Sequence, residues 1–192
     1  MTIAIRLPAA LGLLALGMAC AVAADDDRPA RLTATVTRVV DGDTLDLRLG
    51  KRNVHGVHLR GVDAPELGQP WGHEAAAALS QMVLQQQVDL EPLQQDNRHR
   101  QTAIMFVGEQ EVGAALISDG NAWADRENLG RSDTGLCEVE EAAREAKRGL
   151  WSLPAAKRMA PWEYRRRMLH RHFTDFSEET AAHCAAAMNL RK

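Results

Sequence analysis

The sequence lacks the motifs that mark several common kinds of enzyme site. It has no serine motif of the type used for nucleophilic catalysis and no glycine-rich loop that would hold a phosphate. It also has no internal repeat and no apolar run long enough to span a bilayer as a mature helix. His55, His58, His73 and His99 could suggest a zinc site, but their spacing matches no structural zinc pattern, so we expect them at surface or loop positions.

An excess of positive charge is also missing, since the formal net charge of the 192 residues is −3. Proteins that bind nucleic acid usually carry excess positive charge, which displaces counterions from the phosphates. The basic residues are nevertheless concentrated near the end of the chain, where one acid, Glu163, stands among Lys157, Arg158, Arg165, Arg166, Arg167 and Arg171. Two interpretations stay open for this segment: a surface facing a polyanion, or a solvated helix face.

The first 24 residues have the pattern of a signal peptide. Arg6 provides a positive start, residues 7–19 form an apolar segment too short to span a bilayer comfortably, and residues 21–23 form a small-x-small cleavage pattern. We therefore expect a mature chain that begins near residue 24 or 25 and is periplasmic or secreted. Removing residues 1–24 takes away one base and no acid, so the net charge becomes −4.

Cysteine is scarce, and its three positions fit export. An alternative to cleavage is a lipoprotein anchored at Cys20, but Gly17 stands where lipoproteins usually carry an aliphatic residue. After cleavage only Cys137 and Cys184 remain, and two cysteines in an oxidising compartment predict one disulfide. The alternative is a pair of free thiols.

Hydrophobic periodicity predicts an α+β chain. Proline at position 65 ends the third strand, and glycines at 120 and 149 are typical helix ends. We expect strands at residues 32–40, 44–49, 54–62, 88–93 and 102–107, and helices at 71–86, 111–118 and 136–148. Five short strands in this order suit a small five-stranded barrel of the oligonucleotide/oligosaccharide-binding (OB-fold) type with three helices. The predicted organisation is an acidic linker at 25–31, a barrel domain at 32–153 and a basic, partly helical tail at 154–192.

Two acidic motifs stand at the ends of predicted strands. Residues 41–44 read Asp-Gly-Asp-Thr, and residues 63–66 read Asp-Ala-Pro-Glu. Either motif alone is common as a turn, but side chains at the ends of adjacent strands can meet. Two aspartates supply hard oxygen ligands, and a backbone carbonyl with waters would complete a Ca²⁺ shell. The pair therefore indicates a divalent-metal site.

A base and fixed cations would complete a phosphodiester-cleaving site. Glu66 stands beyond a stiff proline and would act as a general base on the attacking water. The charge that builds on the phosphate oxygens requires fixed cations, for which Arg100 and Arg60 are the candidates.

With these motifs in place, the chain resembles the thermonuclease (staphylococcal-nuclease-like) family from about residue 35 to residue 151. The resemblance rests on an ordered set of segments: VVDGDTLDL at 39–47, VHLRGVDAPE at 57–66, DNRHR at 96–100, ISDGNAW at 117–123 and AKRGLW at 146–151. The family implies a five-stranded barrel with three helices and Ca²⁺-dependent hydrolysis of DNA and RNA. Its metal ligands fall on Asp43, Asp63 and the carbonyl of Ala64, its catalytic glutamate on Glu66 and its second arginine on Arg100.

The chain departs from the family at positions that contact the phosphate and the nucleotide. The family's first catalytic arginine falls on His58, and Arg60, two residues later, lies on the same face if the strand continues. Arg98 and Asn97 stand at substrate-binding positions where the family often has a lysine or arginine and a tyrosine. The tyrosines that hold a nucleotide after Gly120 are absent, and Tyr164 is the single tyrosine of the chain.

These observations predict an exported, monomeric, Ca²⁺-dependent nuclease acting on DNA, RNA or both. Two alternatives remain open. One is a degenerate nuclease-fold module that binds nucleic acid or a partner with little or no catalysis. The other is an interaction protein that works through the basic tail from residue 157.

Overall fold

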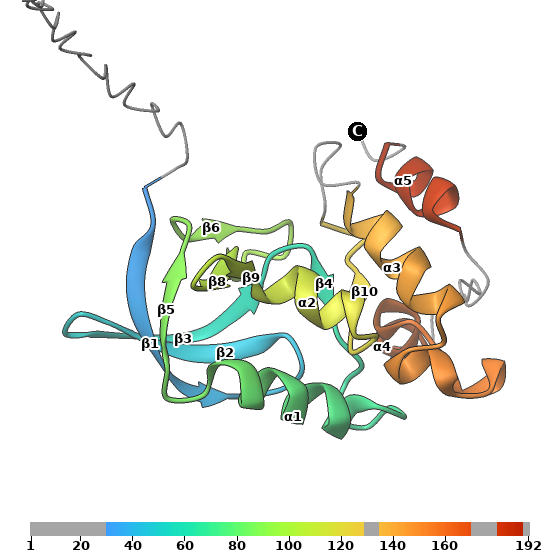
Figure 1. Ribbon diagram of the computed structural model, residues 1–192, viewed down its shortest axis with the longest axis horizontal. Helices are drawn as coiled ribbons and strands as arrows, with labels where there is room; N and C mark the ends of the chain where they lie inside the picture. Colours follow the sequence, from blue (N-terminus) through green and yellow to red (C-terminus); the bar gives the residue numbers. More distant parts are fainter. Residues whose placement is uncertain (1–29, 129–134, 170–179, 190–192) are drawn as a thin grey trace, which may run out of the picture.

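The computed structural model describes residues 30–128, 135–169 and 180–189. The predicted signal peptide, Cys20 and most of the predicted linker at 25–31 lie outside these residues. Figure 1 shows a curled sheet on one side of the molecule and most of the helices on the other, with α1 running beneath the sheet. No described helix has both the length and the apolar character that crossing a membrane requires.

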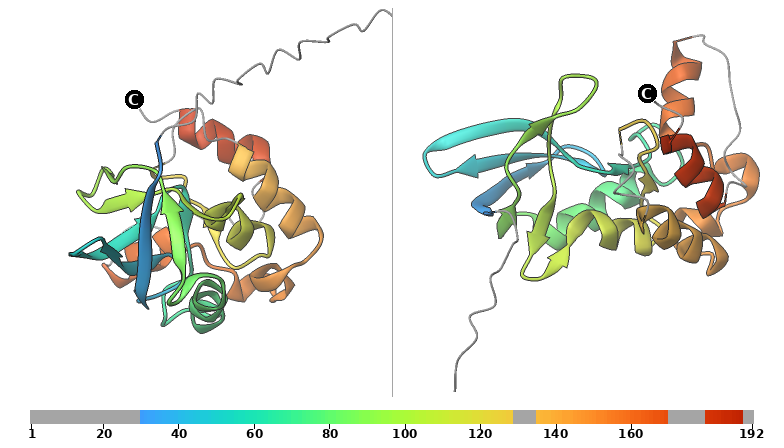
Figure 2. Two further views of the ribbon diagram at one scale, coloured as in Figure 1. Left: turned by 60° about the vertical axis from the view of Figure 1, so that its left-hand side comes forward. Right: turned by 90° about the horizontal axis from the view of Figure 1, so that it is seen from above.

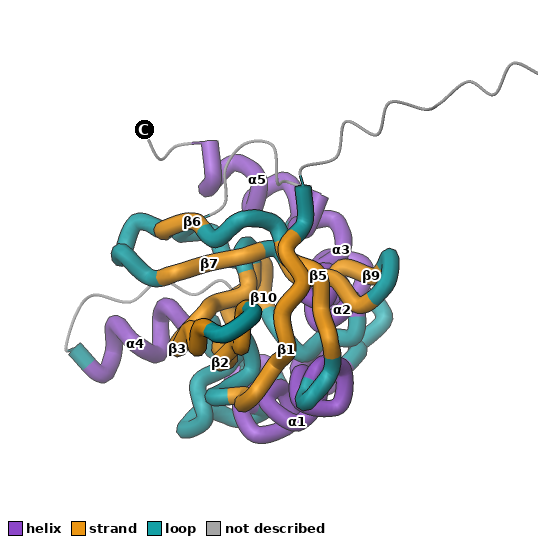
Figure 3. Tube along the Cα trace, turned by 90° about the vertical axis from the view of Figure 1, so that its left-hand side faces the viewer, coloured by secondary structure: helices purple, strands orange, loops and turns teal. Residues whose placement is uncertain are grey.

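The five predicted strands form the barrel. They are β1 (Leu32–Val39), β2 (Thr44–Leu49), β3 (Arg52–Leu59), β5 (Gln87–Leu90) and one extended segment that Ile104 divides into β7 (Gln101–Ala103) and β8 (Met105–Val107). The order in the sheet is β7-β3-β2-β1-β5-β8, so β1 lies beside both β2 and β5 (Figure 3). β7 pairs in parallel with β3, and β8 pairs antiparallel with β5. Because one segment joins both edges, the sheet curls back on itself (Figure 2), and the predicted OB-fold-type α+β class is confirmed.

Four short strands that the periodicity did not predict complete the sheets: β4 (Val62–Asp63), β6 (Gln94–Gln95), β9 (Gln110–Glu111) and β10 (Trp123–Ala124). The predicted strand at 54–62 in fact ends at Leu59, because Gly61 adopts a left-handed backbone with φ of 81° in a turn. After this turn β4 pairs with β10 instead of with the barrel strands. The change of partner carries Asp63 out of the barrel wall and toward the helices.

The three predicted helices are present as α1 (Gly72–Val83), α2 (Val112–Ser118) and α3 (Gly135–Glu145); α1 and α2 lie within the predicted bounds, and α3 begins one residue before its predicted start and ends three residues before its predicted end. The glycines predicted to end α2 and α3, Gly120 and Gly149, both have positive φ and lie against each other. A Cβ at Gly120 would come within 2.1 Å of the Arg148 carbonyl oxygen, so glycine is required there. A 3₁₀ turn, η2 (Gly149–Ser152), precedes the tail, which contains a second one, η3 (Ala155–Lys157), followed by α4 (Pro161–Met168) and α5 (Ala181–Asn189).

Two apolar clusters hold the molecule together. The larger fills the barrel and its contact with α1, where Leu45, Leu90 and Leu79 are completely buried. The smaller joins the barrel to the tail through three tryptophans, since the ring of Trp123 lies 4.4 Å from that of Trp151 and 5.6 Å from that of Trp162. The tail helix α4 is therefore packed onto the barrel through its own core.

A buried ionic network lies beside the tryptophans. The carboxylate of Glu140, which is 1% exposed, accepts two hydrogen bonds from Arg126 at 2.9 and 3.0 Å, one from Arg144 and one from the amide of Ala124 at 2.8 Å. Helix spacing predicts the pair with Arg144, but not the burial. Through Ala124 the network fixes β10, the strand that pairs with Asp63.

The disulfide predicted between Cys137 and Cys184 is present, and it joins α3 to α5 with 5.9 Å between the Cα atoms.

Another buried carboxylate lies on the barrel itself, where Asp46 bonds Arg38, His55 and the Gly56 amide. Burial raises the pKa of Asp46, but these contacts outweigh it and lower the pKa to about 2.

Candidate active site

Asp43 lies in the turn between β1 and β2, and its buried carboxylate is surrounded by donors. The hydroxyl of Thr44 donates to Oδ1 at 2.8 Å, the amide of Ala64 donates to Oδ2 at 2.9 Å, and Nδ1 of His58 lies 3.4 Å from Oδ1. Burial raises the pKa of Asp43, but the bonds from His58, Ala64 and Thr44 outweigh it and hold the pKa below its ordinary value. The bond from Ala64 brings the two acidic motifs of the sequence together.

Asp41 adds a second carboxylate to this turn. Its Oδ1 accepts a hydrogen bond from the amide of Asp43 at 3.1 Å. Burial, followed by repulsion from Asp43, raises the pKa of Asp41 to about 6. The turn therefore carries more negative charge than its own donors neutralise.

Asp63 and Glu66 are joined by an arginine from the tail, which the sequence did not assign to the site. Arg165 of α4 donates to both oxygens of Asp63, at 2.9 and 2.7 Å, and to Oε1 of Glu66 at 2.9 Å. Asp63 is 3% exposed, whereas the side chain of Glu66 is 36% exposed. The predicted metal ligand and the predicted general base thus share one guanidinium.

Burial has the largest effect on the ionisation of Asp63. Burial raises the pKa of Asp63 to about 7, and repulsion from Asp125 and Asp43 adds to this, although Arg165 opposes it. Burial lowers the pKa of Arg165, but its bonds to Asp63 and Glu66 more than reverse this, so the guanidinium stays charged. Two carboxylates share the Arg165 guanidinium, and a buried group of carboxylates of this kind suits a divalent ion.

The donor atoms of this site are oxygens, which suit a hard divalent cation in chemistry. No three His, Cys, Asp or Glu side chains in the described ranges form a metal-binding group by themselves. Asp43 and Asp63 offer two carboxylates, and the carbonyl of Ala64 belongs to the residue whose amide already bonds Asp43. A backbone oxygen and waters are normal members of a Ca²⁺ shell. These residues therefore offer the kind of oxygen donors that a hard divalent cation accepts.

His58 and Arg100 lie next to this acidic group. Nδ1 of His58 is 3.0 Å from Oγ1 of Thr44 and 3.3 Å from Nη1 of Arg100. Asp96 orients Arg100, since it accepts the Arg100 Nε–H at 2.6 Å and the Arg100 amide at 2.9 Å. Burial raises the pKa of Asp96, but these bonds outweigh it and lower the pKa.

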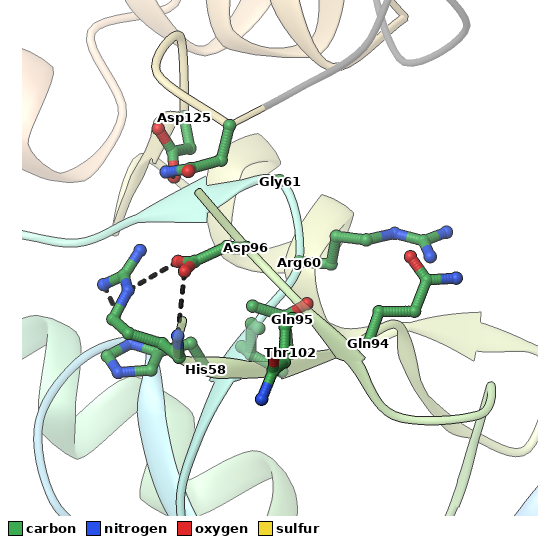
Figure 4. Close-up of a pocket in the computed structure, with 11 residues that line it drawn as sticks. His58, Arg60, Gly61, Gln94, Gln95, Asp96, Thr102 and Asp125 are labelled. Atoms are coloured by element: carbon green, nitrogen blue, oxygen red, sulfur yellow. Dashed lines mark hydrogen bonds and ion pairs between the residues drawn. The ribbon is translucent and has the colours of Figure 1, made fainter. Parts of the chain in front are cut away.

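Arg60, the second candidate for the missing arginine position, points elsewhere. Figure 4 shows its side chain directed away from His58 and Asp96. Its Nη2 donates to Glu91 at 3.0 Å. The reason is the end of β3 at Leu59, after which residues two apart no longer share a strand face. The structure therefore brings His58, and not Arg60, to the carboxylates.

The two predicted substrate-binding residues connect their loop to the segment after β10. Arg98 forms an ion pair with Glu127, and Nδ2 of Asn97 donates to the Glu127 carbonyl at 3.3 Å. Burial and the nearby charges of Arg165 and Arg100 lower the pKa of Arg98. Arg98 therefore lies close enough to be repelled both by Arg165 of α4 and by Arg100 of its own loop.

Asp125 is a further site residue that sequence reasoning missed. It is 3% exposed, its amide bonds the Gly61 carbonyl at 3.0 Å, and its carboxylate accepts from Asn128 at 2.6 Å. Burial raises its pKa, although Asn128 and the nearby arginines oppose this. The polar segment at 121–135 has no periodicity that would have placed it. Arg165, by contrast, belonged to the basic segment that the sequence singled out.

Two hollows adjoin these residues. One of about 80 Å³ is lined by His58, Arg100, Asp96, Asp125 and neighbouring residues (Figure 4). The other, of about 420 Å³, is lined by Arg98, Glu127, Trp162, Arg165, Arg166 and Leu169. We call the second the arginine hollow. Arg165 lines it and also bonds the carboxylates, so it connects the two regions.

A five-stranded barrel that gathers carboxylates and arginines at one end defines a protein of the nuclease fold, and comparison with known proteins agrees. The family model described as "Staphylococcal nuclease homologue" matches residues 56–153. The chain is 31% identical over 140 residues to "Micrococcal nuclease" of Shigella flexneri, covering 68% of this chain and 79% of the relative. It is 34% identical over 146 residues to "Protein ParB" of Escherichia coli, covering 71% and 81%. An "Uncharacterized endonuclease" of Haemophilus influenzae is 31% identical over 121 residues, covering 62% and 66%.

The chain belongs to the staphylococcal nuclease homologue family. The matched region contains Asp63, Glu66 and Arg100. Asp43 precedes that region, and Arg165 follows it. The contact between Arg165 and Asp63 therefore joins the matched region to the tail.

Proposed function

We propose that this chain is an exported, Ca²⁺-dependent nuclease that hydrolyses phosphodiester bonds of DNA, RNA or both. The observation that carries the proposal is the hydrogen bond from the Ala64 amide to Asp43, which joins two acidic motifs 21 residues apart in one buried group. Glu66 follows directly after this group, and Arg100 adjoins it through His58. The family's metal dependence and the nuclease relatives support the same activity.

Asp43, Asp63 and the carbonyl of Ala64 would hold the metal. When bound, Ca²⁺ supplies positive charge to the phosphate oxygens and neutralises the repelling carboxylates. The shared electrostatic repulsion of Asp41, Asp43 and Asp63 supports a dication at this position.

Glu66, Arg100 and His58 would act on the substrate. The partly exposed Glu66 is reachable by water and would accept its proton during attack on phosphorus. Arg100, held through Nε by Asp96, would donate from its Nη atoms to the phosphate oxygens as charge builds on them. His58 stands beside Arg100 and would add a donor, whereas Arg60 is engaged by Glu91.

Export as a monomer belongs to this proposal. The signal-peptide pattern at 1–24 supports it, and the disulfide between Cys137 and Cys184 fits an oxidising compartment. Mass determination of the protein recovered from the periplasm or medium should give a chain starting near residue 24 or 25. A chain that keeps residues 1–24 and stays in the cytoplasm would contradict export.

A nuclease-fold binding module is the second candidate. Arg165 bonds both oxygens of Asp63 and one of Glu66, which are the atoms a metal and a water would need. This candidate predicts nucleic-acid binding without turnover.

One experiment separates the two candidates. The purified chain is incubated with single-stranded DNA or RNA, with Ca²⁺ or with chelator. We expect Ca²⁺-dependent cleavage that falls by ~10²- to 10⁴-fold in Glu66→Gln, because the general base is lost. Glu74→Gln, which changes an exposed glutamate of α1, is the matched control and should cleave like the parent. Binding without cleavage in the parent would favour the module.

A further inference from the structure

The contact of Arg165 with Asp63 and Glu66 suggests a role that the barrel residues do not provide. We propose that Arg165 is a substrate-binding residue that holds the two carboxylates while no metal is bound and moves to a substrate phosphate when the metal occupies Asp63. This inference rests on the proposed nuclease function and identifies a phosphate subsite in the arginine hollow. Its ligand would be the phosphate of a nucleotide in a single-stranded nucleic acid.

Arg165 and a metal compete for the same atoms. The guanidinium uses both Nη atoms on the two oxygens of Asp63, and Nη1 also bonds Glu66. A divalent ion on Asp63 would repel the guanidinium strongly at this distance, because the site is mostly removed from water. Arg165 must therefore give up at least part of this contact when the metal binds.

The arginine hollow is the place that Arg165 already borders. Its lining contains three cations, Arg98, Arg165 and Arg166, and a single acid, Glu127. That acid is already shared, since Arg98 and Arg166 both pair with it, and Arg166 also pairs with Glu163 just beside the hollow. Among the described residues that line this space, a third guanidinium released into it finds no further acid unless an anion enters. Metal binding at the carboxylates and phosphate binding in the hollow should therefore favour each other.

The hollow has the size and chemistry for a nucleotide. A volume of about 420 Å³ lies within the usual range of ligand sites. Arginine forks bind phosphate oxygens in pairs, and the exposed Leu169 adds apolar surface for a sugar or base. The subsite also supplies an arginine to a site in which His58 stands at the family's first arginine position.

Only the side chain of Arg165 has to move, because α4 is held at several points. Trp162 is 2% exposed and packs against Trp123. Gln69 donates to the carbonyl of Met159 at 3.0 Å, which ties the turn after Glu66 to the segment before α4. Tyr164 lies against Gly68, where a Cβ would come within 2.8 Å of its hydroxyl oxygen.

Calorimetry on the full mature chain tests the proposal with two probes. One is Ca²⁺ alone, and the other is thymidine 5′-monophosphate in saturating Ca²⁺, which contains no phosphodiester and cannot be turned over by a phosphodiesterase. We expect Arg165→Gln to bind Ca²⁺ ~5- to 150-fold more tightly, since a competing cation is gone. The same variant should bind the mononucleotide ~10-fold or more weakly, since a charged hydrogen-bond donor is lost.

Arg167→Gln is the matched control. It removes the same charge from the same helix at an exposed residue that does not line the hollow, and both affinities should match the parent. Arg165→Lys keeps a single charge without the fork, and intermediate values are expected for both ligands. Circular dichroism at the assay temperature verifies that each variant is folded. If Arg165→Gln is unfolded, the two affinities of Arg165→Lys are compared with those of the parent instead.

The proposal is supported if Arg165→Gln binds Ca²⁺ more tightly, and the mononucleotide more weakly, than the parent does. Tighter Ca²⁺ binding with unchanged or tighter mononucleotide binding would make Arg165 an inhibitory plug and overturn the phosphate role. Weaker binding of both ligands, or no change in either, would also overturn it. If the parent does not cleave nucleic acid, the nuclease function fails, but these two affinities still decide the role of Arg165.

Discussion

Replacing Glu140 with glutamine removes one negative charge from the centre of a buried network. Both oxygens of Glu140 accept two hydrogen bonds each, from Arg126, Arg144 and the amide of Ala124. Glutamine keeps one of the two acceptor oxygens. In either orientation of the side-chain amide, its nitrogen faces two hydrogen-bond donors of the network and cannot accept from them. The charge of Arg126, which is 2% exposed, loses its main compensation.

The expected cost is ~3–5 kcal/mol in the free energy of unfolding, which is the usual result of removing one partner of a buried ion pair. For a chain of this size each kcal/mol shifts the melting temperature by ~2–4 °C, so the midpoint should fall by ~6–20 °C. Urea and thermal unfolding followed by far-ultraviolet circular dichroism measure both quantities. Glu145→Gln, at an exposed position of the same helix, is the control and should stay within ~0.5 kcal/mol of the parent. A loss below ~1 kcal/mol for Glu140→Gln would refute the reasoning, because it would mean that the attraction within the network only balances the cost of removing its charges from water.

Replacing both Cys137 and Cys184 with serine opens a link between residues 47 apart and should lower the free energy of unfolding by ~4 kcal/mol; an unchanged urea midpoint without reductant would contradict this. His58→Arg should raise the rate of Ca²⁺-dependent cleavage by ~10-fold or more, since it adds a fixed cation beside the carboxylates. An equal or lower rate would show that the parent does not lack a cation there. Because the pKa of Asp46 is lowered to about 2 mainly by Arg38, its contribution to stability is complete above about pH 4 and is lost as the pH falls toward 2. Unfolding of Asp46→Asn between pH 7 and 2.5 should show a weaker acid dependence than the parent, and parallel curves would rule out this contribution.

Local patterns predicted the barrel because its strands alternate over short spans. Leu45 and Leu47 are buried on one face of β2 as their spacing indicates. The same alternation wrongly placed Arg60 on the strand face of His58, because residues two apart share a face only while the strand continues, and β3 ends at Leu59. The turn at Gly61 ends it, and Arg60 then finds Glu91.

The rest of the candidate site depends on contacts between distant segments. Arg165 meets Asp63 across 102 residues, a pairing that neither periodicity nor charge spacing contains. The four-residue spacing from Glu140 to Arg144 predicted their ion pair but not its burial, which Trp123 and Trp151 beside Arg144 help to provide. The tail was recognised as basic from composition, whereas its docking required the tryptophan cluster.

The placement of the tryptophans gives the molecule an internal optical probe. Trp123, Trp151 and Trp162 form the junction between barrel and tail, and Trp71, the remaining tryptophan of the chain, packs against the same cluster and bonds Asn121 at 3.0 Å. The guanidinium of Arg144 lies 4.3 Å from the ring of Trp151. Every indole of the chain therefore lies in or against one junction, and its emission should respond to separation of α4 from the barrel. Intrinsic fluorescence thus follows the docking of the helix that carries Arg165 without any added label.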